Sequence, residues 1–293
     1  LQEAAAGAQP KKDAIVLSLD LRGGVSDQPE MSGFAAFGGG DLSTVEIVRK
    51  LQAAGADNRV KGIYMRAPTR GFSAAAAEEI RGALNAFKTS GKFVVAHLQN
   101  EGVTQSVAGF AVAAGATDLW LDPGAELPPM GFVVSRVYLA DMLKRFAVEA
   151  TPLTPEEALA KKLVSKLGRP IEAETAAIDL AGGAKAAELF PLSAYRSQQQ
   201  PLRSGPAIAL VYAEGEIVGA DSDSGGGFFD EAEISASALT REIEAAAENE
   251  DVKAIVIRVN SPGGSALASD QIGHAIDMAQ MKGKKVVISM GPV

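Results

Sequence analysis

A turn with two consecutive glycines is the part of this sequence best suited to chemistry. It reads Ser261-Pro262-Gly263-Gly264-Ser265 and follows the apolar run at 252–259. Paired glycines let the backbone turn sharply and present N–H groups with no side chain in the way. Such N–H groups can stabilise the oxyanion that forms during acyl transfer. From spacing alone, an ordinary strand-to-helix turn is an equally good interpretation.

Other catalytic or metal-binding arrangements are hard to build from these residues. His97 and His274 are the only histidines, and they fit a strand end and a helix surface better than a Ser-His-Asp triad. The absence of cysteine excludes disulfides and thiolate metal sites, and no other metal ligands occur at useful spacing. The glycines at 38–40 and 225–227 lack the Gly-Lys-Ser/Thr of a phosphate-binding loop. We therefore expect no metal and no cofactor.

Composition excludes some classes of partner. The chain has 293 residues and a net charge of −8, with a pI near 5.0, so it offers no electrostatic footprint for nucleic acid. Its length suits one large domain or, as we prefer, two ordinary ones. The most apolar stretch, 107–116, is too short to span a bilayer, which needs about 20 residues. The chain begins at Leu1 without an initiator Met, so an upstream anchor would not be visible in it.

The glycine turn must be positioned by the elements around it. The β-branched run at 252–259 predicts a strand buried on both faces, a helical pattern extends to Met281, and a second apolar run covers 285–290. A crossover helix of this size favours parallel pairing. The turn then lies at the carboxyl end of a strand, where open α/β sheets bind ligands.

The same order occurs earlier in the chain. We expect strands at 13–21, 60–65 and 93–98, a helix that starts at the capping-box pair Ser43 and Glu46, and a helix at 73–88. Matching residues are 192 positions apart without a gap, as in the pairs Val60/Val252, Arg66/Arg258, Gly71/Gly263, Ser73/Ser265, Gly91/Gly283 and Lys92/Lys284. An internal repeat of this kind predicts two βαβ domains that arose by duplication.

The two copies differ at the turn. The first has Gly71-Phe72-Ser73 where the second has Gly263-Gly264-Ser265. Phe72 would crowd an oxyanion site, so the second copy is the candidate active half.

These features together resemble the long, two-domain form of the signal peptide peptidase A family. The resemblance rests on the segment 258–265, on Lys284 to Gly291 and on the tandem repeat, and it extends over nearly the whole chain. It implies an α/β fold of two tandemly duplicated Clp protease/crotonase-type βαβ domains with mainly parallel sheets. We expect a first repeat domain at 1–150, a connecting helical segment at 151–204 and a second repeat domain at 205–293.

The resemblance implies a membrane-associated serine endopeptidase that degrades cleaved signal peptides and similar apolar peptides. Members of this family use a serine nucleophile and a lysine general base, and the lysine needs a depressed pKa to act. By the family pattern, the serine is expected just beyond Val293. The lysine is expected in a segment absent between Ala150 and Thr151. Lys144, Lys161 and Lys162 do not match its place and are expected to be solvated.

The site residues that the resemblance implies lie around the glycine turn. Gly263 or Gly264 would supply an oxyanion-hole N–H, and a peptide groove would be flanked by Val259, Asn260, Ser261, Pro262, Met290 and Gly291. The expected partners are peptide substrates and further copies of the chain, for example in a tetrameric ring. The expected location is the bacterial inner membrane, with an anchor outside this sequence and the catalytic domains on the periplasmic side.

Two other classes remain open. A crotonase-type acyl-CoA enzyme would use the same glycine N–H groups on a thioester without a serine nucleophile. A non-catalytic membrane scaffold would use both domains for assembly only.

Overall fold

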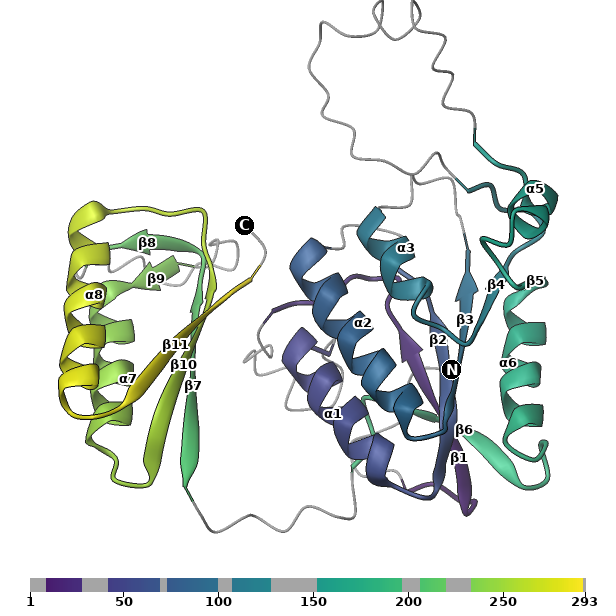
Figure 1. Cartoon of the computed structure of the whole chain (residues 1–293), viewed down its shortest axis with the longest axis horizontal. Helices are drawn as coiled ribbons and strands as arrows, with labels where there is room; N and C mark the ends of the chain where they lie inside the picture. The colour runs from purple at the N-terminus through teal and green to yellow at the C-terminus, as the bar shows by residue number, and fades with distance from the viewer. Residues whose placement is uncertain are drawn as a thin grey trace, which may run out of the picture. The chain divides into compact units, whose positions relative to one another are not determined.

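The computed structural model describes residues 9–27, 42–68, 73–99, 107–127, 152–196, 206–219 and 233–291. The chain divides into two compact units, Leu1–Gln199 and Gln200–Val293 (Figure 1). Every strand pairing between the named strands of the described part is parallel. The predicted α/β fold with mainly parallel sheets is therefore confirmed. The expected catalytic positions beyond Val293 and between Ala150 and Thr151 lie outside the described residues.

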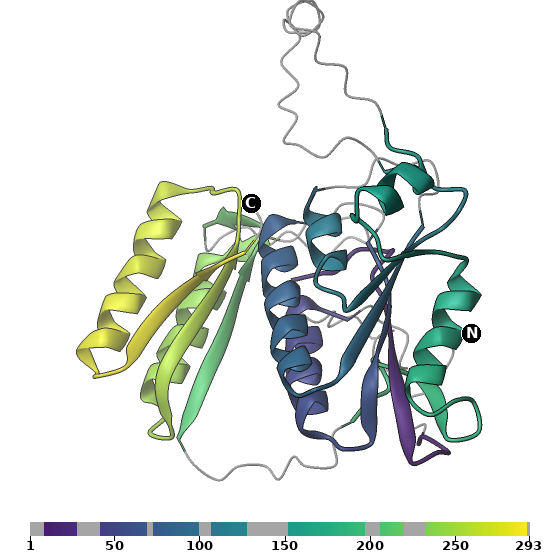
Figure 2. The ribbon, with the colours of Figure 1, turned by 45° about the vertical axis from the view of Figure 1, so that its right-hand side comes forward.

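The first unit is built around a parallel sheet. Its described elements are β1 (Ala14–Asp20), α1 (Thr44–Ala56), β2 (Val60–Arg66), α2 (Ala74–Thr89), β3 (Phe93–Leu98), α3 (Val107–Ala113), β4 (Asp118–Leu121), α5 (Pro155–Ala160), β5 (Lys166–Leu167), α6 (Pro170–Leu180) and β6 (Ala187–Pro191). Within the described residues, the strand order is β5-β4-β3-β2-β1-β6. Helices α1, α2 and α3 cover one face of this sheet and α6 covers the other (Figures 1 and 2).

The central strands of the first unit are buried on both faces, as is usual in parallel sheets. In β1, Ile15 and Leu17 join the core beneath α1 and α2, whereas Val16 packs with Ala173 and Ala177 of α6. The predicted capping box of α1 is also present. Ser43 Oγ accepts from the Glu46 N–H, and the Glu46 carboxylate accepts from the Ser43 N–H. Two backbone donors at the helix start are thereby satisfied.

The segment expected at 151–204 as a helical connection has a larger part in the first unit. It contains helices α5 and α6, but its short strands β5 and β6 also pair with β4 and β1. These strands form the two edges of the described sheet. The described part of this segment therefore belongs to the first compact unit, which extends to Gln199.

The second unit repeats the arrangement on a smaller scale. Its described elements are β7 (Ala207–Glu214), β8 (Glu216–Val218), β9 (Glu233–Ser235), α7 (Ala236–Glu248), β10 (Val252–Asn260), α8 (Ala266–Met281) and β11 (Lys285–Met290). Strands β11, β10 and β7 form one sheet in that order, and β8 pairs with β9. Residues of α7 and α8, such as Ile243 and Ala275, pack with Ile255 and Ile257 of β10 in a single core.

The elements of the two units keep the spacing of the sequence repeat. Helix α1 starts at Thr44 and α7 at Ala236, and β2 starts at Val60 and β10 at Val252. The bounds of α2 and α8, and those of β3 and β11, are likewise 192 residues apart at both ends. The repeat in sequence thus coincides with a repeat of secondary structure.

Candidate functional site

The glycine turn joins β10 to α8, at the carboxyl end of the middle strand of the second unit's sheet. Ser265 is the N-cap of α8, and its Oγ accepts from the Ala268 N–H at 3.3 Å. The turn residues therefore stand between the last strand residue, Asn260, and a capped helix start. This is the place predicted from the sequence, and it is where ligands bind in parallel α/β sheets.

Strand β8 fixes the backbone of the turn. The Ile217 N–H donates to the Gly263 carbonyl at 2.9 Å, and the Ser265 N–H donates to the Ile217 carbonyl at 2.8 Å. Gly264 lies between these two bonds with φ of +153°, and a Cβ there would be 2.1 Å from the Ile217 carbonyl oxygen. Only glycine lets the two backbones approach this closely.

The two glycine N–H groups differ in their hydrogen bonding. The Gly263 N–H donates to Ser261 Oγ at 3.2 Å, and Ser261 is buried. Gly264 is exposed, and its N–H donates no hydrogen bond to any residue that the structure describes. A developing negative charge beside the turn would therefore meet the Gly264 N–H first, because the Gly263 N–H would have to leave its serine partner.

The residues of the expected groove lie around this turn. Met290 pairs in register with Val259, and its side chain is 58% exposed. Asn260 Nδ2 donates to Glu214 Oε1 at 3.2 Å. Pro262 is exposed, and Gly291 donates its N–H to the Val259 carbonyl. Because β10 has neighbours on both sides, a peptide cannot add to it as a further strand and would have to bind beyond its end.

The first unit carries a polar cluster at the carboxyl ends of its own strands, which sequence reasoning missed. Arg22 Nη2 lies 2.7 Å from Asp20 Oδ2, and Arg66 Nη2 donates to Gln99 Oε1 at 2.6 Å. Burial raises the pKa of Asp20, but hydrogen bonds from Arg22 outweigh it and leave the pKa lowered. Asp20 is therefore held as a carboxylate by its arginine. The signal available in the sequence was the opposite charges of Asp20 and Arg66, which stand at the ends of neighbouring strands.

The two histidines differ in environment. His97 was interpreted as a surface or strand-end residue; it does lie near the end of β3 but is only 1% exposed. Its Nε2 lies 2.8 Å from the Gly168 carbonyl oxygen, and burial lowers its pKa. His274 is exposed on α8, as expected. The arrangement gives no serine-histidine pair among the described residues.

Two described lysines have lowered pKa values, the property that a lysine general base needs. Burial lowers the pKa of both Lys50 and Lys92. Lys50 Nζ donates to the Leu192, Ser193 and Tyr195 carbonyls at 3.0, 2.7 and 3.1 Å, respectively. Lys92 Nζ donates to the Ala54 and Asp57 carbonyls at the amino end of the sheet, away from the strand ends that bind ligands. The side-chain amines of both lysines therefore hold backbone segments together through hydrogen bonds.

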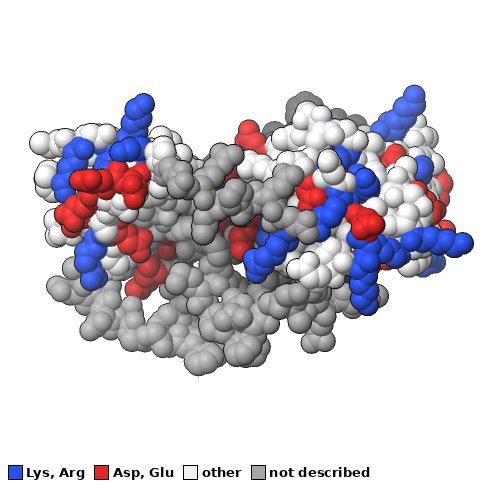
Figure 3. All heavy atoms as spheres, turned by 90° about the horizontal axis from the view of Figure 1, so that it is seen from below, with Lys and Arg blue, Asp and Glu red and all other residues white. Residues whose placement is uncertain are grey.

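Two of the three lysines that were expected to be solvated lie in the described part of the chain. Lys161 and Lys162 are exposed on the described surface, whereas Lys144, Gly71 and Phe72 lie outside it. In the described ranges, no group of three or more His, Cys, Asp or Glu is placed to hold a metal ion. No described helix is long and apolar enough to cross a membrane. On the face shown in Figure 3, Lys and Arg are interspersed with Asp and Glu on each unit.

The chain is thus an α/β protein with parallel sheets, and it carries a glycine turn at the carboxyl end of a strand. Protease 4 of Salmonella typhi is 24% identical over 359 residues, which cover 94% of this chain. Protease 4 of Haemophilus influenzae is 39% identical over 84 residues, or 29% of this chain and 12% of its own length. The chloroplastic serine protease SPPA of Arabidopsis thaliana is 28% identical over 141 residues, or 48% of this chain and 20% of its own length.

The chain is similar in sequence to proteases of the signal peptide peptidase A, or Protease 4, family, the family that its sequence resembled. It spans 56% of the length of the Salmonella typhi relative. No protein-family model matches it. Among solved structures, the 1510-N membrane-bound stomatin-specific protease aligns with 62% of this chain and 99% of its own chain, at 15% identity and a TM-score of 0.39. A putative enoyl-CoA hydratase from Magnetospirillum magneticum covers 47% of this chain and 63% of its own, at 16% identity and a TM-score of 0.33.

Proposed function

We propose that the full-length protein is a membrane-associated serine endopeptidase that degrades cleaved signal peptides and similar apolar peptides. The observation that carries this proposal is the Gly264 N–H, which donates to no described residue and lies at the carboxyl end of β10, where the contacts of Ile217 hold the turn. The relationship to serine proteases of the Protease 4 family supports it. Acyl transfer is the chemistry that a fixed backbone donor at a strand end suits best.

The proposed reaction is a two-step acyl transfer. A serine oxygen attacks the peptide carbonyl, its proton passes to a neutral lysine amine, and the Gly264 N–H binds the resulting oxyanion. The C–N bond then breaks, the lysine returns the proton to the leaving amine, and water hydrolyses the acyl-serine. Gly263 would supply a further N–H once its bond to Ser261 Oγ opens. The nucleophile and base are placed beyond Val293 and between Ala150 and Thr151, respectively.

The length of the alignment supports an absent segment. The match to the Salmonella typhi relative extends over 359 residues, although this chain has only 293. The relative therefore contains stretches that this chain lacks within or between the aligned parts. A lysine-bearing segment between Ala150 and Thr151 is consistent with such a difference in length.

The surface next to the turn supports apolar substrates. Leu267, in the first turn of α8, is 70% exposed, and Met290, at the end of β11, is 58% exposed. Met290 is paired with Val259, two residues before the segment 261–265, and Leu267 follows that segment by two residues, so an extended peptide beyond β10 would lie near exposed apolar side chains. We propose that Val259, Asn260, Ser261, Pro262, Met290 and Gly291 flank this groove. We also propose an anchored, periplasmic homo-oligomer, in line with the membrane-associated members of the family.

We further propose that the two units are Clp protease/crotonase-type domains related by tandem duplication. Side-chain contacts that the fold does not require recur 192 residues apart. Lys61 Nζ donates to the Asn58 carbonyl at 2.9 Å, and Lys253 Nζ donates to the Glu250 carbonyl at 2.8 Å. Lys92 and Lys284 each donate to the carbonyl of the residue that caps the preceding helix, Asp57 or Asn249. Common descent accounts for these shared details better than a shared fold alone.

Turnover by the full-length protein tests the proposed activity. We expect cleavage of an apolar signal-peptide sequence within its hydrophobic region, detected by mass spectrometry, and no turnover of an acyl-CoA thioester. A charged peptide of equal length is the control and should be cleaved more slowly. Turnover of the thioester without peptide cleavage would establish the acyl-CoA enzyme instead. Absence of both activities in the folded protein would favour a scaffold.

A further inference from the structure

Helix α6 packs on the first unit's sheet through small side chains. It lies on the face opposite α1, α2 and α3 (Figures 1 and 2). Its buried residues are Ala173 and Ala177. They pack with Val16, Tyr64 and Val95 of the sheet. An alanine methyl buries little apolar area, whereas α1 and α2 bury isoleucine, leucine and phenylalanine side chains. The α6 side is therefore the more easily opened side of this sheet.

Two polar contacts hold the amino end of α6. Tyr64 Oη donates to the Pro170 carbonyl at 3.1 Å, and His97 Nε2 lies 2.8 Å from the Gly168 carbonyl oxygen. A carbonyl oxygen only accepts, so Nε2 carries the proton of this bond, and the neutral ring has an unprotonated Nδ1. His97 is 1% exposed, and its Nδ1 has no hydrogen-bond partner among the described residues. The ring is thus buried against the residues that lead into α6, with one nitrogen unpaired.

The neighbours of His97 disfavour its protonated form. His97 pairs in register with Arg66 on one side and with Trp120 on the other. A proton on Nδ1 would therefore create a buried cation next to the Arg66 strand position, and the new N–H would have no acceptor among the described residues. Burial lowers the pKa of His97 below the ordinary 6.5, against the opposing effects of the Gly168 carbonyl and Asp122, and Arg66 lowers it further.

Other charged and titratable groups lie on the elements around His97. They are Asp20, Tyr64, Asp118, Lys166, Arg169, Glu172 and Glu174. Three of these carboxylates are paired elsewhere: Asp20 with Arg22, Asp118 with Lys166, and Glu172 with the Arg169 N–H. Histidine is the side chain whose charge ordinarily changes between pH 5 and 8, and His97 is the single histidine of the first unit. A response of this unit in that pH range therefore points to His97.

The second unit has an uncharged side chain at the equivalent position. Ser289 stands 192 residues after His97, and its Oγ accepts from Arg258 Nη1 at 2.9 Å. Arg66 is the equivalent of Arg258, and its Nη2 donates to Gln99 Oε1 at 2.6 Å. The first unit therefore has a titratable ring where the second has a hydroxyl that its arginine can bond. The titratable group is particular to the first unit.

We propose that His97 makes the packing of α6 sensitive to acid, so that protonation of its Nδ1 moves residues 168–180 away from the sheet. Nε2 donates to the Gly168 carbonyl in both protonation states, so the two states differ at Nδ1. Water can accept from the charged Nδ1–H once these residues have moved, and the apolar side chains of Val16 and Val95 then become accessible. This proposal is independent of the peptidase activity proposed above.

The direction of the pH effect follows from the burial of the ring. The closed form binds the proton more weakly than an exposed histidine does. Its stability relative to the open form is therefore complete above the ordinary histidine pKa of about 6.5 and is lost as the pH falls below that value.

Thiol accessibility along α6 in the full-length protein tests this proposal. The chain contains no cysteine, so Ala177→Cys and Leu180→Cys each introduce a single thiol here, after replacement by serine of any cysteine in the flanking residues. Ala177 is 0% exposed and Leu180 is 57% exposed. The reagent is dithiodipyridine, which reacts with thiols at acid pH. From about pH 7.5 to about pH 5.5, we expect the rate at 177 relative to that at 180 to rise by about threefold to tenfold, the range that uptake of one proton allows.

Two further variants separate this local opening from other effects of acid. His97→Gln keeps an N–H that can donate to the Gly168 carbonyl but does not titrate, so in its background the ratio should not depend on pH. Ala83→Cys places a thiol beneath α2, where Ala83 is 7% exposed, and its rate relative to that at 180 should stay constant. A rise at 177 of less than about threefold, or an equal rise in the His97→Gln background, would overturn the proposal. An equal rise at 83 would also overturn it, because the whole unit would then open.

Hydrogen exchange followed by mass spectrometry makes the same test in the natural protein, without any new thiol. After correction for the intrinsic pH dependence of exchange, peptides from α6 should lose protection as the pH falls below about 6.5, whereas peptides from α2 should keep it. Unchanged protection of α6 over this range would contradict the proposed opening.

Discussion

Replacement of Gly264 by alanine is expected to lower the peptidase kcat of the full-length protein by about 10²–10³-fold, the usual effect of losing one oxyanion donor. The added Cβ would lie 2.1 Å from the Ile217 carbonyl oxygen, so the turn and β8 would have to separate. Gly264 also has φ of +153°, which an alanine rarely adopts. The Gly264 N–H would therefore move away from the position where the oxyanion forms.

The matched control is Gly273→Ala, in the helix that follows the turn. Gly273 lies within α8, and a Cβ there meets no atom within 4 Å. This variant should keep its kcat and gain up to about 1 kcal/mol in the free energy of unfolding, because alanine favours helix. Far-UV circular dichroism and the thermal midpoint show whether the Gly264→Ala protein is folded. A folded Gly264→Ala protein with unchanged kcat would contradict an oxyanion role for this turn.

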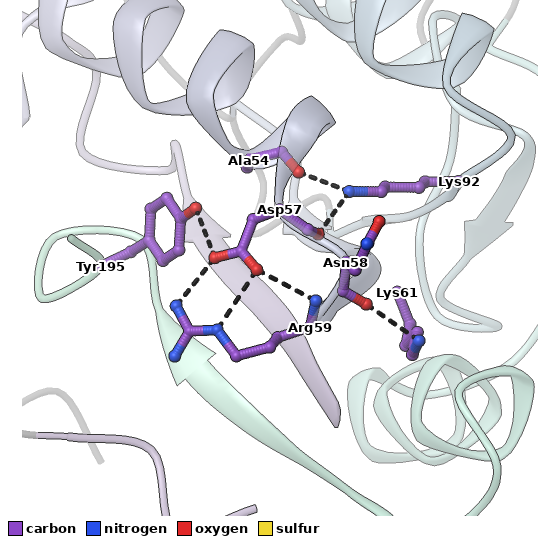
Figure 4. A network of polar contacts seen from close by, with 7 residues as sticks. All are labelled: Ala54, Asp57, Asn58, Arg59, Lys61, Lys92 and Tyr195. Atoms are coloured by element: carbon purple, nitrogen blue, oxygen red, sulfur yellow. Dashed lines mark hydrogen bonds and ion pairs between the residues drawn. The ribbon is translucent and has the colours of Figure 1, made fainter. Parts of the chain in front are cut away.

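The second large effect concerns the stability of the first unit. Figure 4 shows Asp57 at the centre of a network that joins the end of α1, the start of β2 and the turn after β6. Its carboxylate accepts from Arg59 N at 3.0 Å, Nε at 3.2 Å and Nη2 at 2.8 Å, and from Tyr195 Oη at 3.1 Å. Asp57 is 6% exposed and Tyr195 is 2% exposed. These bonds connect segments that are 138 residues apart in sequence.

Asp57→Ala should lower the free energy of unfolding of the first unit by about 2 kcal/mol, because it removes a buried carboxylate that accepts hydrogen bonds from the partly exposed Arg59 and from Tyr195. The chain has a single tryptophan, Trp120 in β4, so its fluorescence in urea follows this unit. Lys61→Ala is the control, since exposed Lys61 donates to the nearby Asn58 carbonyl and to no other residue in the described ranges; a change within about 0.5 kcal/mol is expected. An equal change in both variants would contradict the assigned role of the network.

The same network predicts a pH dependence. Burial raises the pKa of Asp57, but the hydrogen bonds from Arg59 and Tyr195 outweigh it, so the folded-state pKa lies below the ordinary 3.8. A lowered folded-state pKa gives stability that is present above the unfolded value and is lost as pH falls through the folded value. The stability difference between the natural protein and Asp57→Asn should therefore be constant near neutral pH and shrink below about pH 4.

Much of the framework was predictable from local sequence. The strand at 252–259, the helix ending at Met281 and the capping box of Ser43 and Glu46 were all predicted and are all present, but Ala254 and Val256 of that strand are only partly buried, so its predicted burial on both faces is not seen in the described part. They depend on interactions between residues close in sequence, and such interactions leave periodic or short fixed patterns. The 192-residue repeat then indicated that the same elements occur twice.

The features that sequence reasoning missed depend on contacts between distant segments. Strand β8 has three residues, too few for a period, yet Ile217 fixes the glycine turn. The pairing of β6 with β1 and the bond from Tyr195 to Asp57 each join residues far apart in the chain. The difference between the Gly263 and Gly264 N–H groups also depends on Ser261 Oγ and β8 together. No short sequence pattern encodes these contacts.

The most direct test of the central claim is reaction of the full-length protein with a fluorophosphonate, followed by peptide mapping. We expect the label on a serine shortly beyond Val293, and its loss when a lysine encoded between Ala150 and Thr151 is replaced by alanine. Because Gly264 is expected to stabilise the same oxyanion, Gly264→Ala should label more slowly. A folded, full-length protein that takes up no label, or takes it up on an unrelated serine, would contradict the proposed serine-lysine peptidase.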